Sequence, residues 1–243
     1  FCLNTACPVP DTTTSPSPPA AAAPASRMTA LERRSSLGLA AIFAMRMLGL
    51  FLVLPVFMLE ARKYAGGDDP ALVGLAMGMY GLTQAFFQLP LGMASDRFGR
   101  KRVIALGLLV FAAGSLVAAL ADSVMGLLVG RALQGAGAVS AAVTALLADQ
   151  TRDAVRTKAM ALVGVSIGLM FAVALVAAPF LAAHVGLSGL FVLTFALALA
   201  GVALILWVVP PETRHHGAAP QGRPSDVWRY ADLLRLNLGV FAL

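Results

Sequence analysis

The sequence predicts an all-α membrane protein whose helices cross a bilayer several times. Hydrophobic residues make up 59% of the 243 residues and charged residues only 12%, whereas soluble domains carry about 25% charged residues. Residues 70–95 and 103–121 contain no charged residue. Each run is long enough for a helix to cross a hydrocarbon core of about 30 Å, which takes about 20 residues. Because every backbone polar group in the core must be paired within its own segment, such runs predict helices rather than barrel strands.

Six membrane spans are predicted along the chain. They cover residues 37–59, 71–94, 103–121, 124–148, 159–183 and 187–209. Together they form one bundle over residues 28–209, followed by a cytoplasmic linker at 210–235 and the start of a truncated seventh span at 236–243. Both ends of the chain are therefore expected to be those of a fragment. Residues 1–27, rich in Pro, Ala, Ser and Thr, are expected to be a disordered tail, which a start at Met28 would leave untranslated.

The distribution of Lys and Arg predicts the orientation of the spans. The N-terminal segment and every second loop after it hold fourteen basic residues, and the other loops hold two, Arg62 and Lys63. Because basic residues accumulate in cytoplasmic loops, the N-terminus is expected in the cytoplasm. The net charge of +6 follows from this topology, so no nucleic-acid partner is expected.

Two further arginines, Arg46 and Arg131, lie inside predicted spans. An arginine at the centre of a membrane helix costs about 2.5 to 3.5 kcal/mol on insertion scales, so it normally faces a bundle interior or a water-filled path. Gln84 and Gln88 in the second span and Gln134 in the fourth add polar groups nearby. These five residues are predicted to line a cavity or to take part in coupling. The alternative is a structural role, in which they form hydrogen bonds between helices without a ligand.

Small residues and prolines within the spans predict close helix contacts. Gly130 and Gly135 in the fourth span and Ala178 beside Pro179 in the fifth are the candidate helix-packing residues. Small side chains let membrane helices approach closely, and a proline removes a backbone donor and permits a bend.

Residues 92–102 place five charges between the second and third spans. Asp96 can accept from Arg100 one helical turn later, and Gly99 permits a tight turn. Asp149, at the cytoplasmic end of the fourth span, is predicted to join this pair. The alternative is that the charges only anchor the loop among lipid headgroups.

The same segment carries a family resemblance. Residues 92–102 contain G-x-x-x-D-R-x-G-R-K at the position where the major facilitator superfamily has its loop motif, and Arg131 lies in an R-x-x-Q-G sequence that resembles the fourth-helix motif of that family. Ala178-Pro179 resembles the Gly-Pro pair of its drug exporters, with alanine replacing glycine. Further short matches resemble the YajR-type inner-membrane drug-efflux transporters; they are Arg46-Met47-Leu48-Gly49, Tyr80-Gly81-Leu82-Thr83-Gln84-Ala85, Lys158-Ala159-Met160 and Trp207-Val208-Val209-Pro210.

This resemblance implies a fold of two six-helix halves around a substrate cavity, of which the chain supplies the N-terminal half, built as a three-plus-three inverted repeat. It implies a multi-pass protein of the bacterial inner membrane that exports small molecules or drugs by alternating access coupled to protons. A nutrient or metabolite importer and a non-transporting sensor or scaffold are the alternatives. The expected partners are a small-molecule substrate, protons, the lipid bilayer and the C-terminal half of the same protein.

The resemblance also implies a conformational latch at the cytoplasmic side. Its residues are Gly92, Asp96, Arg97, Gly99, Arg100, Lys101 and Asp149. The sequence contains no nucleophile elbow, phosphate loop or histidine cluster and no carboxylates at metal-ligand spacing, so neither an enzyme nor a cofactor or metal site is expected.

Overall fold

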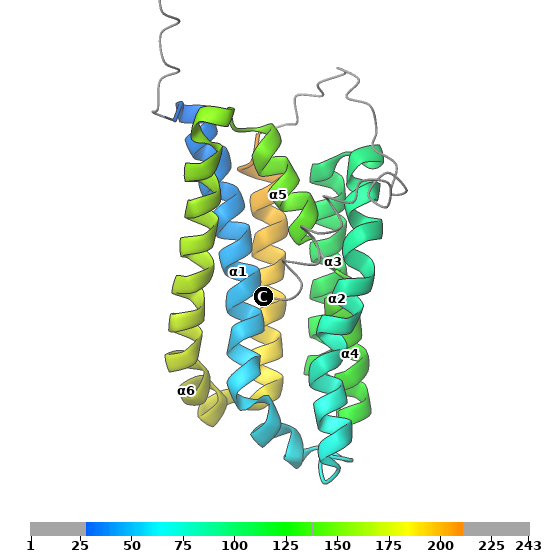
Figure 1. Cartoon of the computed structure of the whole chain (residues 1–243). Helices are drawn as coiled ribbons and strands as arrows, with labels where there is room; N and C mark the ends of the chain where they lie inside the picture. The colour runs from blue at the N-terminus through cyan, green and yellow to red at the C-terminus, as the bar shows by residue number, and fades with distance from the viewer. Residues whose placement is uncertain (1–27, 138, 211–243) are drawn as a thin grey trace, which may run out of the picture. The chain divides into compact units, whose positions relative to one another are not determined.

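Helices form the regular structure of residues 28–137 and 139–210, the part of the chain that this computed structural model describes (Figure 1). In chain order they are α1 (Ala30–Glu60), the 3-10 helix η1 (Ala61–Lys63), α2 (Pro70–Phe98), α3 (Arg100–Ala119), α4 (Val124–Ala136), α5 (Ser140–Asp149) and α6 (Asp153–Trp207). The all-α prediction is confirmed. The tail over residues 1–27, the linker beyond Pro210 and the seventh span were predicted for residues that lie outside the described part.

Polar side chains begin three of the helices. The Thr29 hydroxyl accepts from the backbone N–H of Glu32 at 3.2 Å, and the Glu32 carboxylate accepts in return from the N–H of Thr29 at 2.8 Å. Asp69 caps α2, with Pro70 in its first turn, and Ser123 caps α4. Such caps satisfy backbone donors that have no partner in the first turn of a helix.

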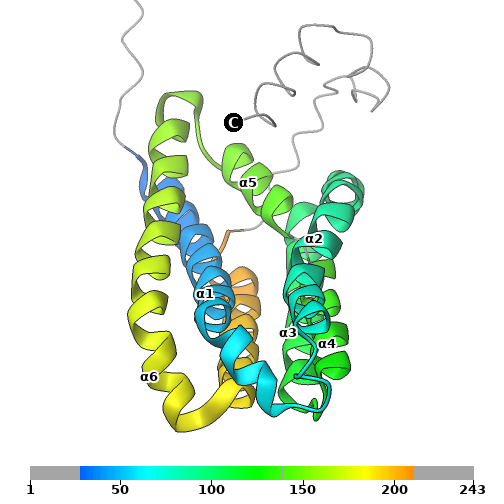
Figure 2. The same cartoon turned by 60° about the horizontal axis from the view of Figure 1, so that its bottom comes forward.

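The helices pack as two connected groups. α1 lies between the two arms of α6, and α2, α3 and α4 lie together beside them; the views of Figures 1 and 2 agree on this arrangement. α3 contacts both α4 and α6 and so joins the two groups. Apolar side chains fill the contacts, and among them Leu39, Phe57, Ile104, Leu127 and Phe191 are almost completely buried.

α6 contains the fifth and sixth predicted spans. Gly186 interrupts it with a non-helical backbone (φ 64°, ψ −174°), and the chain folds back there into two arms (Figure 2). A positive φ is readily adopted by glycine because it has no Cβ. The predicted boundary between residues 183 and 187 therefore falls at the turn, although no loop separates the two arms.

The fourth predicted span, residues 124–148, is not one continuous helix. α4 ends at Ala136 and α5 begins at Ser140. At this break a Cβ on Gly137 would lie 2.8 Å from the backbone N of Phe111, and a Cβ on Gly107 would collide with the side chain of Val139. The interrupted backbone thus packs directly against α3, a long-range contact that hydropathy does not report.

The predicted loop between the second and third spans is also shorter than expected. α2 continues to Phe98 and α3 starts at Arg100, so that Gly99 alone separates them. Gly99 has φ 96° and ψ 132°, a conformation that side chains with a Cβ strongly disfavour. The motif is therefore a one-residue hinge between two long helices.

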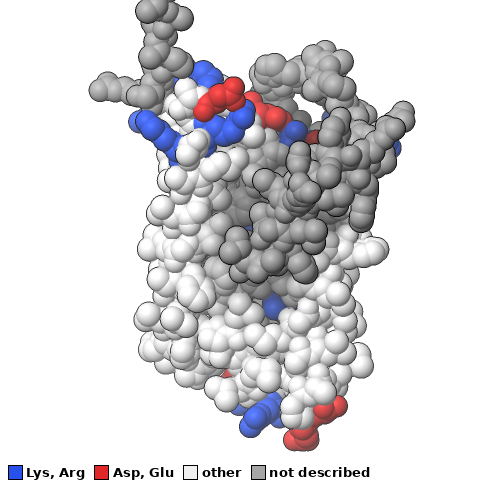
Figure 3. Space-filling view, in the orientation of Figure 1, with Lys and Arg blue, Asp and Glu red and all other residues white. Residues whose placement is uncertain are grey.

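Charged side chains gather at the two ends of the bundle, and the outer surface between them is almost free of charge, with blue atoms visible there only within a hollow (Figure 3). Within the described residues, five helical segments are long and apolar enough to cross a membrane when α4 and α5 are counted together and α6 is counted once. Large apolar side chains such as Phe86, Val176 and Trp207 are 74 to 80% exposed on the outside of the bundle. An exposed apolar band of this kind suits a lipid environment.

Candidate functional site

Arg46 forms the centre of a polar cluster inside the bundle. Its side chain comes from α1 and is only 2% exposed. One terminal nitrogen, Nη1, donates to the Ser140 hydroxyl at 3.1 Å, and the other, Nη2, donates to the Tyr80 hydroxyl at 3.0 Å and lies 3.5 Å from Gln84 Oε1. The guanidinium carbon lies 5.4 Å from the ring centre of Phe111. Residues of α2, α3 and α5 therefore surround this one charge.

Arg131, from α4, lies over the ring of the same tyrosine. It is 1% exposed, and its guanidinium carbon is 4.9 Å from the ring centre of Tyr80 and 5.8 Å from that of Phe57. Its Nη1 donates to Gln134 Oε1 at 3.2 Å, and Gln134 Nε2 donates to the Ser115 hydroxyl at 2.8 Å. Tyr80 thus connects two buried arginines, accepting a hydrogen bond from one and presenting its ring to the other.

The cluster carries two positive charges without a described counterion. None of the ion pairs among the described residues includes Arg46 or Arg131, and the Nε atoms of both are buried without a hydrogen-bond partner there. Aromatic rings offset part of the cost of burial, because a cation over a ring gains about 0.5 to 2 kcal/mol. The described acids all lie at helix ends or in connections; they are Glu32, Glu60, Asp68, Asp69, Asp96, Asp122, Asp149 and Asp153.

The structure brings four of the five predicted cavity or coupling residues together. Arg46 and Gln84 meet at the tyrosine hydroxyl, and Arg131 and Gln134 meet beside the ring. Gln88 makes none of these contacts: its side-chain oxygen is buried without a hydrogen-bond partner among the described residues.

Three members of the cluster were not predicted from the sequence. Tyr80 lies one turn before Gln84 on the same face of α2, a spacing that could have identified it. Ser115 and Ser140 are isolated hydroxyl residues in apolar segments, and such residues commonly bond to their own helix backbone. Their contacts depend on the packing of α3 and α5, so spacing alone gives no signal for them.

The predicted packing glycines hold α4 close to its neighbours. A Cβ on Gly130 would lie 2.7 Å from the backbone N of Ala118 in α3, and a Cβ on Gly135 would collide with the backbone carbonyl of Tyr80 in α2. Gly135 thereby places the adjacent Gln134 within reach of the cluster. Ala178 is completely buried in α6, whereas Pro179 beside it is exposed.

A second polar cluster lies at the end of the bundle where α2 meets α3. Arg100 Nη2 is 3.3 Å from Asp96 Oδ1, and Arg100 Nε is 2.7 Å from Asp149 Oδ2. The three side chains come from α3, α2 and α5, with Gly99 as the hinge beside them. We call Asp96, Arg100 and Asp149 the carboxylate bridge. Its members are 23 to 60% exposed, so each ion pair contributes about 0 to 1 kcal/mol.

The remaining predicted latch residues occupy different positions. Lys101 Nζ donates to the carbonyl of Val209 at 2.8 Å and to that of Leu206 at 3.3 Å, at the end of α6. A cation at the C-terminal end of a helix is stabilised by the helix dipole. Gly92 faces α5, where a Cβ would lie 3.7 Å from that of Ala141. Arg97 is exposed in the last turn of α2.

An ion pair that the sequence did not suggest joins α1 to the α5–α6 connection. The Glu32 carboxylate, on a residue that is 5% exposed, accepts from Arg152 Nε at 2.8 Å, from Arg152 Nη2 at 3.1 Å and from the Arg152 backbone at 3.2 Å. Because Arg152 donates hydrogen bonds to the negatively charged Glu32 carboxylate, the pKa of Arg152 is raised above its ordinary value. The Thr-x-x-Glu spacing predicts a helix cap, whereas the partner 120 residues away requires the fold.

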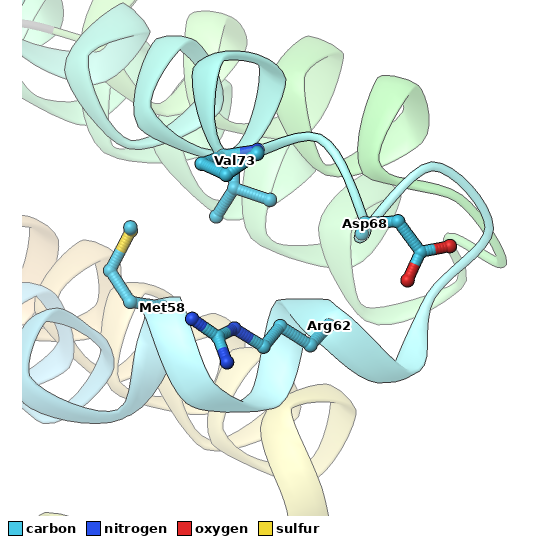
Figure 4. A pocket seen from close by; sticks show the side chains of 6 residues that line it. Met58, Arg62, Asp68 and Val73 are labelled. Carbon is cyan, nitrogen blue, oxygen red and sulfur yellow. The ribbon is translucent and has the colours of Figure 1, made fainter.

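A pocket of about 300 Å³ lies at the opposite end of the bundle, between η1 and the start of α2. Met58 and Val73 face one another across it, and Arg62 and Asp68 lie toward the loop (Figure 4). Arg62 and Asp68 are both exposed, so this pocket presents no buried polar group comparable to the arginine cluster.

A helical bundle with an apolar outer band, buried arginines and charged ends defines a class, that of polytopic membrane proteins. Residues 35–242 match the family model described as Major Facilitator Superfamily, and the chain belongs to this family. The predicted resemblance is thereby confirmed, and the family and its relatives indicate a transporter rather than an enzyme.

Curated relatives support this membership. The chain is 49% identical to the inner membrane transport protein YajR of Escherichia coli K12 over 221 residues, which cover 89% of the chain and 48% of that protein. It is 33% identical to the class B tetracycline resistance protein of Escherichia coli over 141 residues, covering 57% of the chain and 34% of that protein. The chain spans about half the length of the first of these relatives.

Solved structures agree in fold. The human organic anion transporter MFSD10 (TETRAN) aligns with a TM-score of 0.63 and 24% identity over 74% of the chain and 48% of that structure. The peptide transporter PepTSo aligns with a TM-score of 0.65 and 19% identity over 71% of the chain and 37% of that structure. At these identities the likeness describes the fold alone.

Proposed function

We propose that the full-length protein is a secondary active transporter that exports small molecules by alternating access, coupled to protons, from the cytoplasm of a bacterium. The observation that carries the proposal is the carboxylate bridge beside the one-residue hinge at Gly99. The relative named as an inner membrane transport protein supports the location, and those named as tetracycline resistance proteins support export of drug-like compounds.

In this proposal the carboxylate bridge acts as a conformational latch. Arg100 ties the ends of α2, α3 and α5 together, so these three ends move as one unit against the C-terminal half of the protein. Two exposed ion pairs supply at most about 2 kcal/mol. A bias of about 1.4 kcal/mol changes a conformational equilibrium tenfold. The bridge is thus strong enough to bias the transport cycle and weak enough to open during it.

The latch is tested in the full-length protein with Asp96→Asn and Asp149→Asn. Each change keeps the shape of the side chain and removes one of the two carboxylates that pair with Arg100. We expect normal membrane insertion and about a three- to tenfold loss of transport, measured as tetracycline accumulation in cells and as flux in proteoliposomes. Asp153→Asn is the matched control, because the described ion pair of Asp153 is with Arg156 of the same helix, at 2.8 Å. Equal transport by wild type and all three variants would refute the latch.

Proton coupling needs a group that titrates in the membrane. The described acids lie at helix ends or in connections, so we propose that the coupling carboxylate is in the C-terminal half, with Arg131 adjusting its pKa from a distance. Full-length protein in liposomes is expected to move substrate faster when a pH gradient is imposed. Identical rates with the gradient and with a protonophore would exclude the coupling, and no flux at all would favour a sensor or scaffold.

A further inference from the structure

The break between α4 and α5 places a helix start beside the buried arginine. α5 begins at Ser140, and its N-cap residue, Val139, offers no side-chain hydrogen bond to the first turn. The first N–H groups of a helix lack intrahelical acceptors and carry partial positive charge, which makes them donors for an anion. Arg46 Nη1 donates to the hydroxyl of Ser140 at 3.1 Å. The guanidinium of Arg46 therefore lies at this helix start.

Independent features of Arg46 indicate a missing anionic partner. The residue is 2% exposed, and its Nε is buried without a hydrogen-bond partner among the described residues. Its Nη1 and Nη2 atoms donate to side-chain oxygens of Ser140, Tyr80 and Gln84, and all three of these acceptors are neutral. Arg131 adds a second buried positive charge over the Tyr80 ring, whose hydroxyl accepts from Arg46. Two positive charges and the start of a helix thus lie close together, and none of the described carboxylates pairs with either arginine.

We propose that Arg46 and the N-terminus of α5 form a binding site for a small anionic group, the carboxylate of a transported compound. Arg46 and the first N–H groups of α5 bind the anion directly, and the Tyr80 hydroxyl donates to it while accepting from Arg46. Arg131, over the ring of Tyr80, strengthens the positive potential. The identity of the anion as a substrate rests on the transport function proposed above, whereas the site itself does not.

The experiment measures anion-dependent stability of the full-length protein in detergent. Thermal unfolding midpoints are recorded against acetate, benzoate and octanoate, against neutral benzamide, and against chloride and phosphate at equal ionic strength. For wild type we expect at least one carboxylate to raise the midpoint saturably, while benzamide does not. Arg46→Gln is expected to weaken the apparent affinity at least about tenfold, and Arg46→Lys, which keeps the charge, less. Arg62→Gln removes an exposed arginine at the other end of the bundle and should bind as wild type does.

The different anions in this experiment distinguish the possible kinds of ligand. Saturable binding of a carboxylate but not of chloride or phosphate supports an organic anion as the ligand, and binding of chloride or phosphate alone overturns the assignment to a transported carboxylate. If no anion raises the unfolding midpoint of wild type more than that of Arg46→Gln, the site is refuted. A carboxylate of the C-terminal half acting as the counterion of Arg46 would give this result. Carboxylate binding through Arg46 in a protein that moves no solute would leave the site standing and refute the proposed function.

Discussion

Gly135→Ala is the most direct test of how α4 is held against α2. A Cβ at Gly135 would collide with the backbone carbonyl of Tyr80 and with the Thr83 hydroxyl. The hydroxyl can rotate, but the carbonyl belongs to α2, so the two helices must separate. Overpacking of this kind costs about 1 to 3 kcal/mol. The displacement would also move Gln134 away from its 2.8 Å contact with Ser115, which adds the cost of a lost buried hydrogen bond, about 1 kcal/mol.

The matched control is Gly201→Ala in α6. Gly201 is also buried in the bundle, but a Cβ there would meet the Leu108 side chain at 3.5 and 3.8 Å, an ordinary packing distance. Replacing glycine by alanine within a helix stabilises it by up to about 1 kcal/mol where space permits. In thermal unfolding of the full-length protein in detergent, Gly135→Ala should lower the midpoint and Gly201→Ala should leave it unchanged or raise it. Equal midpoints for the two variants would refute the close contact between α2 and α4.

Two further substitutions test the end of the bundle that carries the carboxylate bridge. Gly99→Ala forces a side chain into a backbone conformation with φ 96°, at a cost of about 1 to 3 kcal/mol, and should lower both the unfolding midpoint and transport. In the control Gly92→Ala, the new Cβ would lie 3.7 Å from that of Ala141, an ordinary contact, and the midpoint should not fall. Glu32→Gln should lower the midpoint, because Arg152 loses the carboxylate that binds it through two side-chain nitrogens. Glu60→Gln, which only affects an exposed pair with Lys63, should not, and equal midpoints would contradict a stabilising role for the Glu32 pair.

Features that depend on neighbouring residues were predictable from the sequence. Uncharged runs identified the spans because crossing a bilayer demands a continuous apolar helix. Asp96 and Arg100 are four residues apart, so their pairing required only local geometry. Gly99 was predicted to allow a turn, although the length of the helices on either side was not, since α2 and α3 continue through most of the motif.

Features that depend on distant contacts were not predictable in the same way. Lys101 belongs to the same motif as Arg100 but binds the end of α6, 108 residues away at Val209. The break between α4 and α5 lies in the predicted span at residues 124–148, whose one charged residue is Arg131, and hydropathy is equally satisfied by a straight helix. Its position follows from the packing of Gly137 and Val139 against α3.

The sequence by itself determined that this chain is a helical membrane bundle of the Major Facilitator Superfamily, with a charged hinge at residues 92–102 and two arginines in its interior. Only the tertiary structure decided what those arginines contact. Arg46 and Arg131 are 85 positions apart in the sequence, and they meet at Tyr80 because the packing of the two helix groups brings these side chains of α1, α2 and α4 together. An arginine within an apolar run is costly to bury, so the sequence alone indicates that it faces the interior of the bundle. Its partners come from other helices, and which residues they are depends on how those helices pack.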